Sequence, residues 1–404
     1  MAVGAATRPV LHPVSGIQLA TVQAGIRRPG EPDLVLMALS AETRLAAVFT
    51  RNAFRAAPVR IAETHLGDDT PRYLLINTGN ANAGTGAAGE AAARGNCQTL
   101  ADLGNCRASQ VIPFSTGVIG ERLPAERIDA ALPAALAGLQ ADGWAAAADG
   151  IRTTDTRPKG RSERLVLEGG TVTLTGIAKG SGMIRPDMAT MLAFIATDAA
   201  IETTLLRQLL REAVAESFNR ITVDGDTSTN DACALMATGA SGVALDREGG
   251  DRRRFAAALS RLCQGLARDI VADGEGATRL VTIRVRAAAS VAEAERVAFT
   301  IAESPLVKTA LFAGDPNWGR ILAAVGRAGI ERLDVAGVAI AIDDLVIAEG
   351  GGVSPTYDEQ AAAARMAAEA FTLEVSLGRG SQEATVWTCD LSYDYVRINA
   401  EYRS

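Results

Sequence analysis

Histidine, the side chain that most often serves as a general base in enzymes, occurs only twice in this sequence, at His12 and His65. His65 lies in a polar stretch, AETHLGDDTPR, that is typical of a surface loop. The five cysteines are odd in number and form no CxxC pair, which favours reduced thiols. We therefore expect neither a histidine-based triad nor a His-rich metal site, and a nucleophile of this chain must be activated in another way.

Three segments contain residue types that are common in ligand-binding sites, but none shows the complete motif of a known site. Residues 84–89 match GxGxxG, but the stretch SQVIPFS lacks the acidic residue that a dinucleotide site needs about 20 positions further on. Residues 224–231, DGDTSTND, lack the glutamate of a calcium loop, because position 235 is Leu. We interpret the first as a glycine-rich turn and the second as a turn or an active-site lining. Residues 314–319, GDPNWG, indicate either a stiff turn with a buried Trp or a loop near a substrate.

Residues 176–195, GIAKGSGMIRPDMATMLAFI, contain a candidate nucleophile, unlike the three segments above. Taken alone, Thr190 is an ordinary β-branched residue that enters a strand. The segment is, however, similar to the self-processing site of the ornithine acetyltransferase family, whose chains cut themselves between Ala and Thr of Ala-Thr-Met-Leu. Arg185 and Asp187 depart from the residues expected there, which puts the rate of processing in question more than its chemistry. Further segments resemble this family in the same order over nearly the whole chain, namely 47–53, 77–86, 115–120, 153–156, 222–231, 273–278, 314–320 and 395–404.

The resemblance implies self-cleavage between Ala189 and Thr190, giving an α chain, 1–189, and a β chain, 190–404, that fold together with interleaved lobes. The new α-amine of Thr190, with an ordinary pKa near 7.7–8.0, then serves as the base for its own hydroxyl. By the same resemblance, Thr190 takes the acetyl group of N2-acetyl-L-ornithine and passes it to L-glutamate through an acetyl-threonine intermediate. This reaction belongs to arginine biosynthesis.

The resemblance also implies which residues hold the reacting groups. Thr116 and Gly117 are the expected oxyanion hole, whose donors are each worth roughly 3–4 kcal/mol of the barrier. Lys179 could pair with the substrate carboxylate as a point charge, and Glu275 could face the ammonium of ornithine. The alternative for each is a solvated side chain in a turn. The residues expected at the substrate are Thr154, Lys179, Thr190, Glu275, Asn399 and Ser404.

Exchange of one amide for a similar amide is nearly thermoneutral, so we expect no cofactor, nucleotide or metal. Whether acetyl-CoA is a further donor stays open, because both kinds of family member share these motifs. The family also implies an assembly of two α and two β chains. Three other functions remain open: a related N-terminal-nucleophile hydrolase or aminopeptidase, an acyltransferase paralogue of a secondary pathway, and a non-catalytic amino-acid-binding protein.

The composition bounds the remaining possibilities. The chain has 404 residues, of which 48% are hydrophobic and 22% charged, as in globular proteins. A net charge of −7 without a basic block disfavours nucleic acid and anionic membranes as partners. There is no apolar run of roughly 18–20 residues that could span a bilayer, and no secretory signal pattern. We therefore expect a cytoplasmic protein.

The elements that must position these residues mix hairpins with helices, which predicts α+β layers with an antiparallel or mixed sheet. The length predicts two lobes. The resemblance sharpens this to a layered α/β sandwich of the N-terminal-nucleophile-like type, with a smaller second lobe. We expect hairpins at 165–175 and 338–348, helices at 124–139, 201–218, 255–270 and 357–371, and strands at 280–286 and 386–396.

Overall fold

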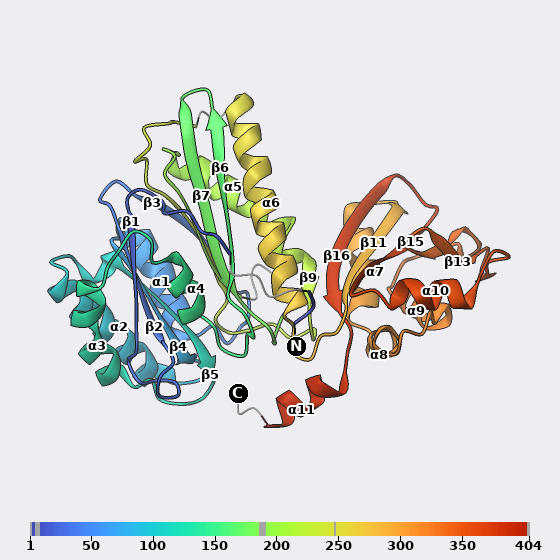
Figure 1. The fold of residues 1–404 in the computed structure, drawn as a ribbon, viewed down its shortest axis with the longest axis horizontal. Helices are drawn as coiled ribbons and strands as arrows, with labels where there is room; N and C mark the ends of the chain where they lie inside the picture. Colours follow the sequence, from blue (N-terminus) through green and yellow to red (C-terminus); the bar gives the residue numbers. More distant parts are fainter. Residues whose placement is uncertain (1, 5–8, 186–190, 246–247, 402–404) are drawn as a thin grey trace.

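The protein has two lobes (Figure 1). A computed structural model describes residues 2–4, 9–185, 191–245 and 248–401. The first lobe is built on two sheets and the second, smaller lobe on a third sheet. The predicted layered α+β architecture with a smaller second lobe is thereby confirmed.

The first lobe contains a four-stranded and a five-stranded sheet. Strands β8 and β10 lie inside the five-stranded sheet, and every residue of both is buried because each face of this sheet is covered. The order of the first sheet is β1 (Ile17–Val22), β2 (Leu34–Leu39), β4 (Tyr73–Asn80) and β5 (Val111–Val118). The order of the second is β3 (Arg44–Phe49), β10 (Ala232–Ala237), β8 (Leu192–Thr197), β7 (Gly170–Lys179) and β6 (Lys159–Leu167).

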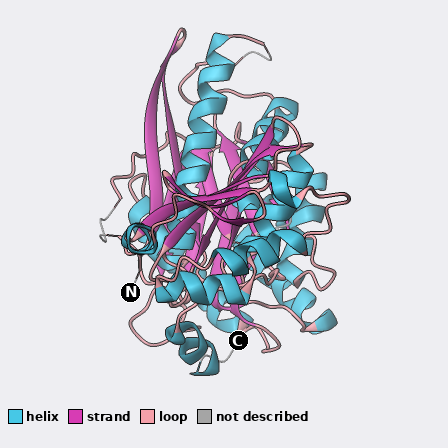
Figure 2. Ribbon diagram, turned by 90° about the vertical axis from the view of Figure 1, so that its right-hand side faces the viewer, coloured by secondary structure: helices cyan, strands magenta, loops and turns pink. Residues whose placement is uncertain are grey.

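These two sheets pack face to face and are flanked by helices, which gives four layers. Figure 2 shows the strands in the middle of the molecule with helices around them. Between the sheets, Phe114 of β5 and Phe194 of β8 meet edge to face with their ring centroids 5.0 Å apart. The outer layers bury the apolar faces of their helices against the sheets. The helices of this lobe are α1 (Ala57–Asp68), α2 (Gly86–Leu103), α3 (Ala125–Ala137), α4 (Trp144–Gly150), α5 (Thr203–Ala215) and α6 (Gly250–Ala272).

The second lobe is a seven-stranded sheet covered by helices around its own core. Its strands, in sheet order, are β14 (Gly352–Val353), β13 (Leu345–Glu349), β12 (Ala339–Ile342), β15 (Ala370–Ser376), β11 (Leu280–Ala288), β16 (Gln382–Cys389) and β9 (Ile221–Thr222). Its helices are α7 (Val291–Ala302), α8 (Pro305–Ala313), α9 (Trp318–Gly326) and α10 (Glu359–Met366).

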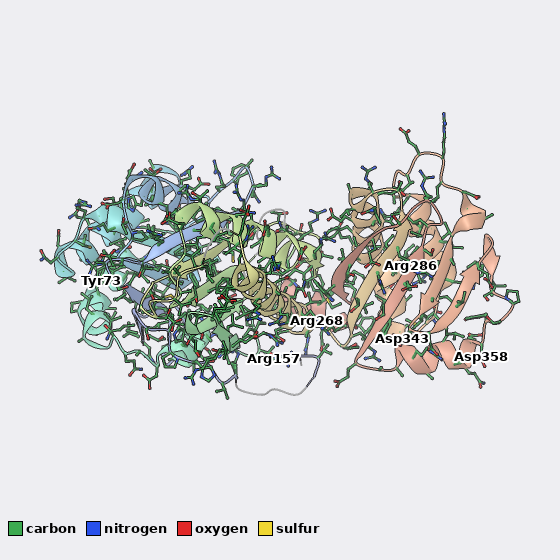
Figure 3. The ribbon with its side chains drawn as sticks, turned by 90° about the horizontal axis from the view of Figure 1, so that it is seen from above. Tyr73, Arg157, Arg268, Arg286, Asp343 and Asp358 are labelled. Atoms are coloured by element: carbon green, nitrogen blue, oxygen red, sulfur yellow. The ribbon has the colours of Figure 1, made fainter. Side chains whose placement is uncertain are left out.

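Two segments tie the lobes together. The short strand β9, from a part of the chain between first-lobe elements, pairs with β16 of the second lobe. Helix α11 (Tyr393–Glu401) leaves the second lobe and returns beneath the first (Figure 1). A Cβ built on Gly276 would lie 2.4 Å from the backbone nitrogen of Tyr395, so this helix could not approach a larger residue so closely. Figure 3 shows Arg157 and Arg268 near the junction and Arg286 on the second lobe.

Three sequence interpretations were wrong in detail. His65 is buried within α1 rather than in a surface loop, and its Nδ1 lies 2.7 Å from the carbonyl oxygen of Val111. Residues 393–396 belong to helix α11 and not to the last strand, which ends at Cys389. The Ala-rich helix is shorter than expected, because Phe371 already lies in β15. Local pattern alone did not reveal the packing that decides these cases.

Candidate active site

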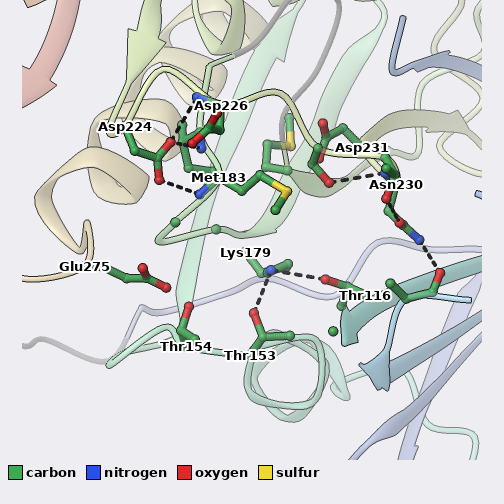
Figure 4. Close-up of a pocket in the computed structure, with 18 of the residues that line it drawn as sticks. Thr116, Thr153, Thr154, Lys179, Met183, Asp224, Asp226, Asn230, Asp231 and Glu275 are labelled. Carbon is green, nitrogen blue, oxygen red and sulfur yellow. Dashed lines mark hydrogen bonds between the residues drawn. The ribbon is translucent and has the colours of Figure 1, made fainter. Parts of the chain in front are cut away.

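A cavity of about 150 Å³ lies where the end of β5, the end of β7 and helix α11 meet (Figure 4). Its wall is formed by several segments that are far apart in the sequence. They include the 224–231 loop and two residues from either side of the expected cleavage site, Ile184 and Met191. The expected cleavage site itself, Ala189 and Thr190, and the expected substrate contact Ser404 lie outside the described residues. The other expected site residues all line this cavity: Thr116, Gly117, Thr154, Lys179, Glu275 and Asn399.

Lys179, the last residue of β7, is buried at the cavity wall. Its ammonium donates hydrogen bonds to the hydroxyl oxygens of Thr153, at 2.8 Å, and Thr116, at 3.2 Å (Figure 4). Burial lowers the pKa of Lys179, and the nearby carboxylates, led by that of Asp155, oppose this shift. Because the Thr116 oxygen accepts from an ammonium, its own hydrogen is directed elsewhere and can be offered to a ligand.

Gly117 lies at the end of β5, where the pairing with β4 shifts register. Its φ is +135°, and a Cβ built on it would lie 2.3 Å from the carbonyl carbon of Gly79. Only glycine can therefore occupy this position without displacing β4. The close approach of the two strands fixes the backbone of the expected oxyanion hole beside Thr116.

Glu275 forms the wall toward α11. Its Oε2 accepts a hydrogen bond of 2.9 Å from the side-chain amide of Asn399, and its backbone N–H donates to the carbonyl oxygen of Ser181 at 2.9 Å. A Cβ on Gly182 would lie 2.5 Å from the carboxyl group of Glu275, so glycine is required for this carboxyl group to fit. The expected contacts Glu275 and Asn399 thus hold each other, and α11 closes this side of the cavity.

The 224–231 loop lines the cavity, as one of the two sequence interpretations proposed. Asp224 accepts hydrogen bonds from the backbone N–H groups of Met183, at 2.6 Å, and Ile184, at 2.8 Å. Burial raises the pKa of Asp224, although these bonds oppose the shift. Asn230 donates from its side-chain amide to the carbonyl oxygen of Ser115 at 2.9 Å and so ties the loop to β5. The sequence singled out neither Asp224 nor Asp231 individually.

A second group of charges, Asp155, Lys159 and Asp273, adjoins the cavity wall and forms the buried triad. The ammonium of Lys159 is 2.6 Å from a carboxylate oxygen of each aspartate, and all three side chains are almost fully excluded from solvent. Asp155 also accepts from the backbone N–H of Gly180 at 2.7 Å and of Thr153 at 3.0 Å. Burial acts to raise the pKa of Asp155, but Lys159, Lys179 and these hydrogen bonds hold it below its ordinary value.

The buried triad explains why Lys179 and Thr153 are held in place. The carboxylate of Asp155 accepts hydrogen bonds from the backbone N–H of Gly180, which follows Lys179, and from the backbone N–H of Thr153. The ammonium of Lys179 and the hydroxyl of Thr153 then face each other across the cavity wall. The grouping of these three residues could not be predicted from the sequence, since the two aspartates are more than 100 positions apart.

Residues 84–89 do not line the cavity, and their last four residues lie in α2. The 314–319 turn belongs to the second lobe, where Gly314 ends α8 in a left-handed conformation and Asn317 caps α9. Within the described part of the chain, no group of three His, Cys, Asp or Glu side chains could hold a metal ion. No helix of that part is long and apolar enough to cross a membrane.

A small cavity of buried hydroxyl, ammonium and carboxyl groups, enclosed by the first lobe and helix α11, is typical of an enzyme with a small-molecule site. The chain belongs to the ArgJ family, whose model matches residues 18–404. This confirms the resemblance to the ornithine acetyltransferase family.

Relatives match the chain over its full length. It is 52% identical over 406 residues, which cover 100% of both chains, to the arginine biosynthesis bifunctional protein ArgJ of Pseudomonas syringae pv. tomato. It is 54% identical over 395 residues to the protein of the same name from Methylococcus capsulatus, with 98% of this chain and 97% of the relative covered. A solved structure of the Bacillus halodurans protein of that name is 43% identical, with a TM-score of 0.50. The match covers 98% of that solved chain but only 52% of this one.

Proposed function

We propose that this chain is a self-cleaving glutamate N-acetyltransferase of arginine biosynthesis, which moves the acetyl group of N2-acetyl-L-ornithine to L-glutamate. The full-length identity to proteins named for arginine biosynthesis supports this function over a hydrolase or a binding protein. The observation that carries the proposal at the site is the convergence of six expected residues, from distant segments, on one small cavity.

In the proposed first stage, the chain is cut between Ala189 and Thr190. Strand β7 ends before this bond and β8 begins after it, and the two strands pair in antiparallel register from Leu174↔Thr197 to Lys179↔Leu192. Products 1–189 and 190–404 would therefore stay joined by one sheet after the cut. The half-length of the solved relative from Bacillus halodurans is consistent with a chain that is processed near its middle.

In the proposed second stage, the hydroxyl of Thr190 attacks the acetyl carbon of N-acetylornithine, and the α-amine of Thr190 takes the hydroxyl proton. The oxyanion that forms is stabilised by the hydroxyl of Thr116 and the backbone N–H of Gly117. The hydrogen bond from Lys179 directs and polarises the Thr116 hydroxyl for this role.

The proton then passes to the departing ornithine nitrogen, and glutamate attacks the acetyl ester in the same way. Glu275 faces the side-chain ammonium of ornithine, and the positive charge of Lys179 attracts the substrate carboxylate. Thr154, Asn399 and Ser404 complete the substrate contacts.

The relatives' names describe bifunctional proteins, and on that ground we add acetyl-CoA as a second acetyl donor for glutamate. We also propose an α2β2 assembly of the two products and a cytoplasmic location. Assays with each donor separately, and the mass of the native protein in solution, test the first two of these points.

Replacement of the nucleophile tests the central proposal. Wild type is expected to give two chains by intact mass, with Thr-Met-Leu-Ala-Phe at the new N-terminus, and to transfer acetyl from N-acetylornithine to glutamate. Thr190→Ala is expected to stay uncut and inactive, while Thr190→Ser keeps a hydroxyl and should retain part of both activities. A fully active wild type that remains a single 404-residue chain would contradict the proposal.

A further inference from the structure

Among the described carboxyl groups that line the cavity, Asp231 is the one with a buried oxygen that lacks a hydrogen-bond partner. Asp224 is bound by backbone N–H groups, and Glu275 by Asn399. Ser228 hydrogen-bonds to the carboxyl group of Asp231, but Oδ2 has no hydrogen-bond partner among the described residues. Asp231 is only 4% exposed. A buried polar atom of this kind is costly and calls for a functional explanation.

The position of Asp231 is set by the parallel pairing of β8 and β10. Ala232 is in register with Leu192, and the N–H of Ala232 donates to the carbonyl oxygen of Met191 at 2.8 Å. Neighbouring strands are about 4.8 Å apart. The backbone of Asp231 therefore lies beside Met191, the residue that follows the proposed nucleophile directly in the chain.

The proposed self-cleavage needs a base that the mature enzyme does not need. The α-amine of Thr190 exists only after the cut, so another group must accept the proton of the hydroxyl during the first step. Neither His12 nor His65 is among the described residues that line the cavity. Lys179 acts as a donor to two hydroxyl groups. Among the described residues, the unpartnered Oδ2 of Asp231 is the acceptor that lies beside the start of β8.

We propose that Asp231 is the general base, and then the general acid, of the self-cleavage reaction, an inference that rests on the proposed function. The Oγ–H bond of Thr190 breaks as Oγ bonds to the carbonyl carbon of Ala189, and the proton passes to the carboxylate of Asp231. The C–N bond between Ala189 and Thr190 then breaks, and Asp231 returns the proton to the departing nitrogen, which becomes the α-amine. Water hydrolyses the resulting ester, giving the Ala189 carboxylate and the free hydroxyl.

The charges around Asp231 suit this exchange. Burial raises the pKa of Asp231 well above its ordinary value, while Ser228 and the ammonium of Lys179 oppose the shift. A carboxyl group whose pKa is raised toward the working pH both accepts and returns a proton readily. The other charged groups on the described cavity wall, Asp224, Asp226 and Glu275, are acidic and do not favour its ionised form. Cleavage should therefore accelerate as the pH rises through the pKa of Asp231.

The test follows cleavage of the full chain after a pulse of cell-free synthesis, by denaturing gel and intact mass. Asp231→Asn keeps the size of the side chain but removes the base, and it should slow cleavage by about 100-fold or more. The matched control is Asp198→Asn, at the far end of β8, where a buried aspartate accepts a hydrogen bond of 2.7 Å from the backbone N–H of Thr173. This control should be cut at the wild-type rate.

Chemical rescue and the pH dependence of cleavage distinguish a role of Asp231 as a base from a purely structural role. Asp231→Ala should regain cleavage in proportion to added formate, which can enter the space left by the carboxyl group, whereas chloride should have no effect. The wild-type cleavage rate should rise with pH through one ionisation. Cleavage of Asp231→Asn within threefold of wild type, or a wild-type rate independent of pH between about 5 and 9, would overturn the role of Asp231. A wild-type chain that is never cut at residue 189 would instead contradict the proposed function.

Discussion

The buried triad and the cavity contain the same kinds of charged side chain, yet their hydrogen bonding differs. In the triad, Lys159 is shared by two carboxylates, and Asp155 also binds two backbone N–H groups. In the cavity, the ammonium of Lys179 donates its hydrogen bonds among the described residues to two neutral hydroxyl groups, and Asp231 keeps one oxygen without a described partner. Charges that are fully paired fix the backbone, whereas charges left partly unpaired remain available to a substrate.

The largest effect is expected from removal of the triad's cation. Lys159→Met leaves two buried carboxylates without their partner and should lower the free energy of unfolding by about 3–5 kcal/mol, measured by urea unfolding. The control is Arg161→Met on the same strand, which breaks a surface pair with Asp269 at 2.8 Å and should cost about 1 kcal/mol or less. If both variants lose the same free energy of unfolding, the buried triad contributes no more to stability than a surface ion pair.

A smaller effect, on catalysis rather than stability, is expected for Glu275→Gln. This change keeps the hydrogen-bonding shape toward Asn399 but removes the charge. It should lower kcat/KM for N-acetylornithine by about 10- to 150-fold, or roughly 1.5–3 kcal/mol, because a charge-assisted contact is lost. An acetylated donor without the side-chain ammonium should be affected much less.

Self-cleavage is expected to survive in Glu275→Gln, since no substrate is present during processing. Equal losses with both donors would mean that Glu275 does not recognise the ammonium. An uncut chain would instead assign Glu275 to processing or to the fold.

The smallest effect, a shift of a few degrees in Tm, concerns the opposite pKa shifts of two aspartates. Because the pKa of Asp155 is lowered by folding, its contribution to stability is present above pH ~4 and is lost as the pH falls further. The pKa of Asp231 is raised by burial, so its ionisation increasingly opposes folding as the pH rises above ~4.

The comparison is made in uncut protein, with Thr190→Ala against Thr190→Ala plus Asp231→Asn. The double variant should have the higher Tm at pH 8, and the two should converge at pH 4. A lower Tm of the double variant at pH 8 would place Asp231 with the triad, as a residue that the fold needs in its charged form.

The sequence predicted the regular elements well where one periodicity continues for many residues. The hairpin of β6 and β7 and the amphipathic helices α5 and α6 are examples, because their patterns are local. The buried His65 and the turn from β16 into α11 were missed, since both depend on contacts with distant segments. Prediction of the fold as a layered sandwich came from the family resemblance rather than from these patterns.

At the candidate site, too, the sequence predicted some features, and others depend on contacts between distant segments. The resemblance pointed to Lys179 and Glu275 as substrate contacts, and both line one cavity in the structure. It could not show that Lys179 donates to Thr116, or that one oxygen of Asp231 lacks a partner, because both facts arise only when β5, β7 and β10 are assembled. Residue type and spacing identify candidates, but unsatisfied hydrogen bonding is a property of the folded protein.

Helix α11 has a practical consequence for recombinant expression. Its residue Asn399 holds Glu275, and its backbone at Tyr395 packs against Gly276, so the last helix of the chain forms part of the cavity wall. A purification tag fused behind this helix would add bulk and charge next to this wall of the cavity. An affinity tag is therefore better placed at the other end of the polypeptide.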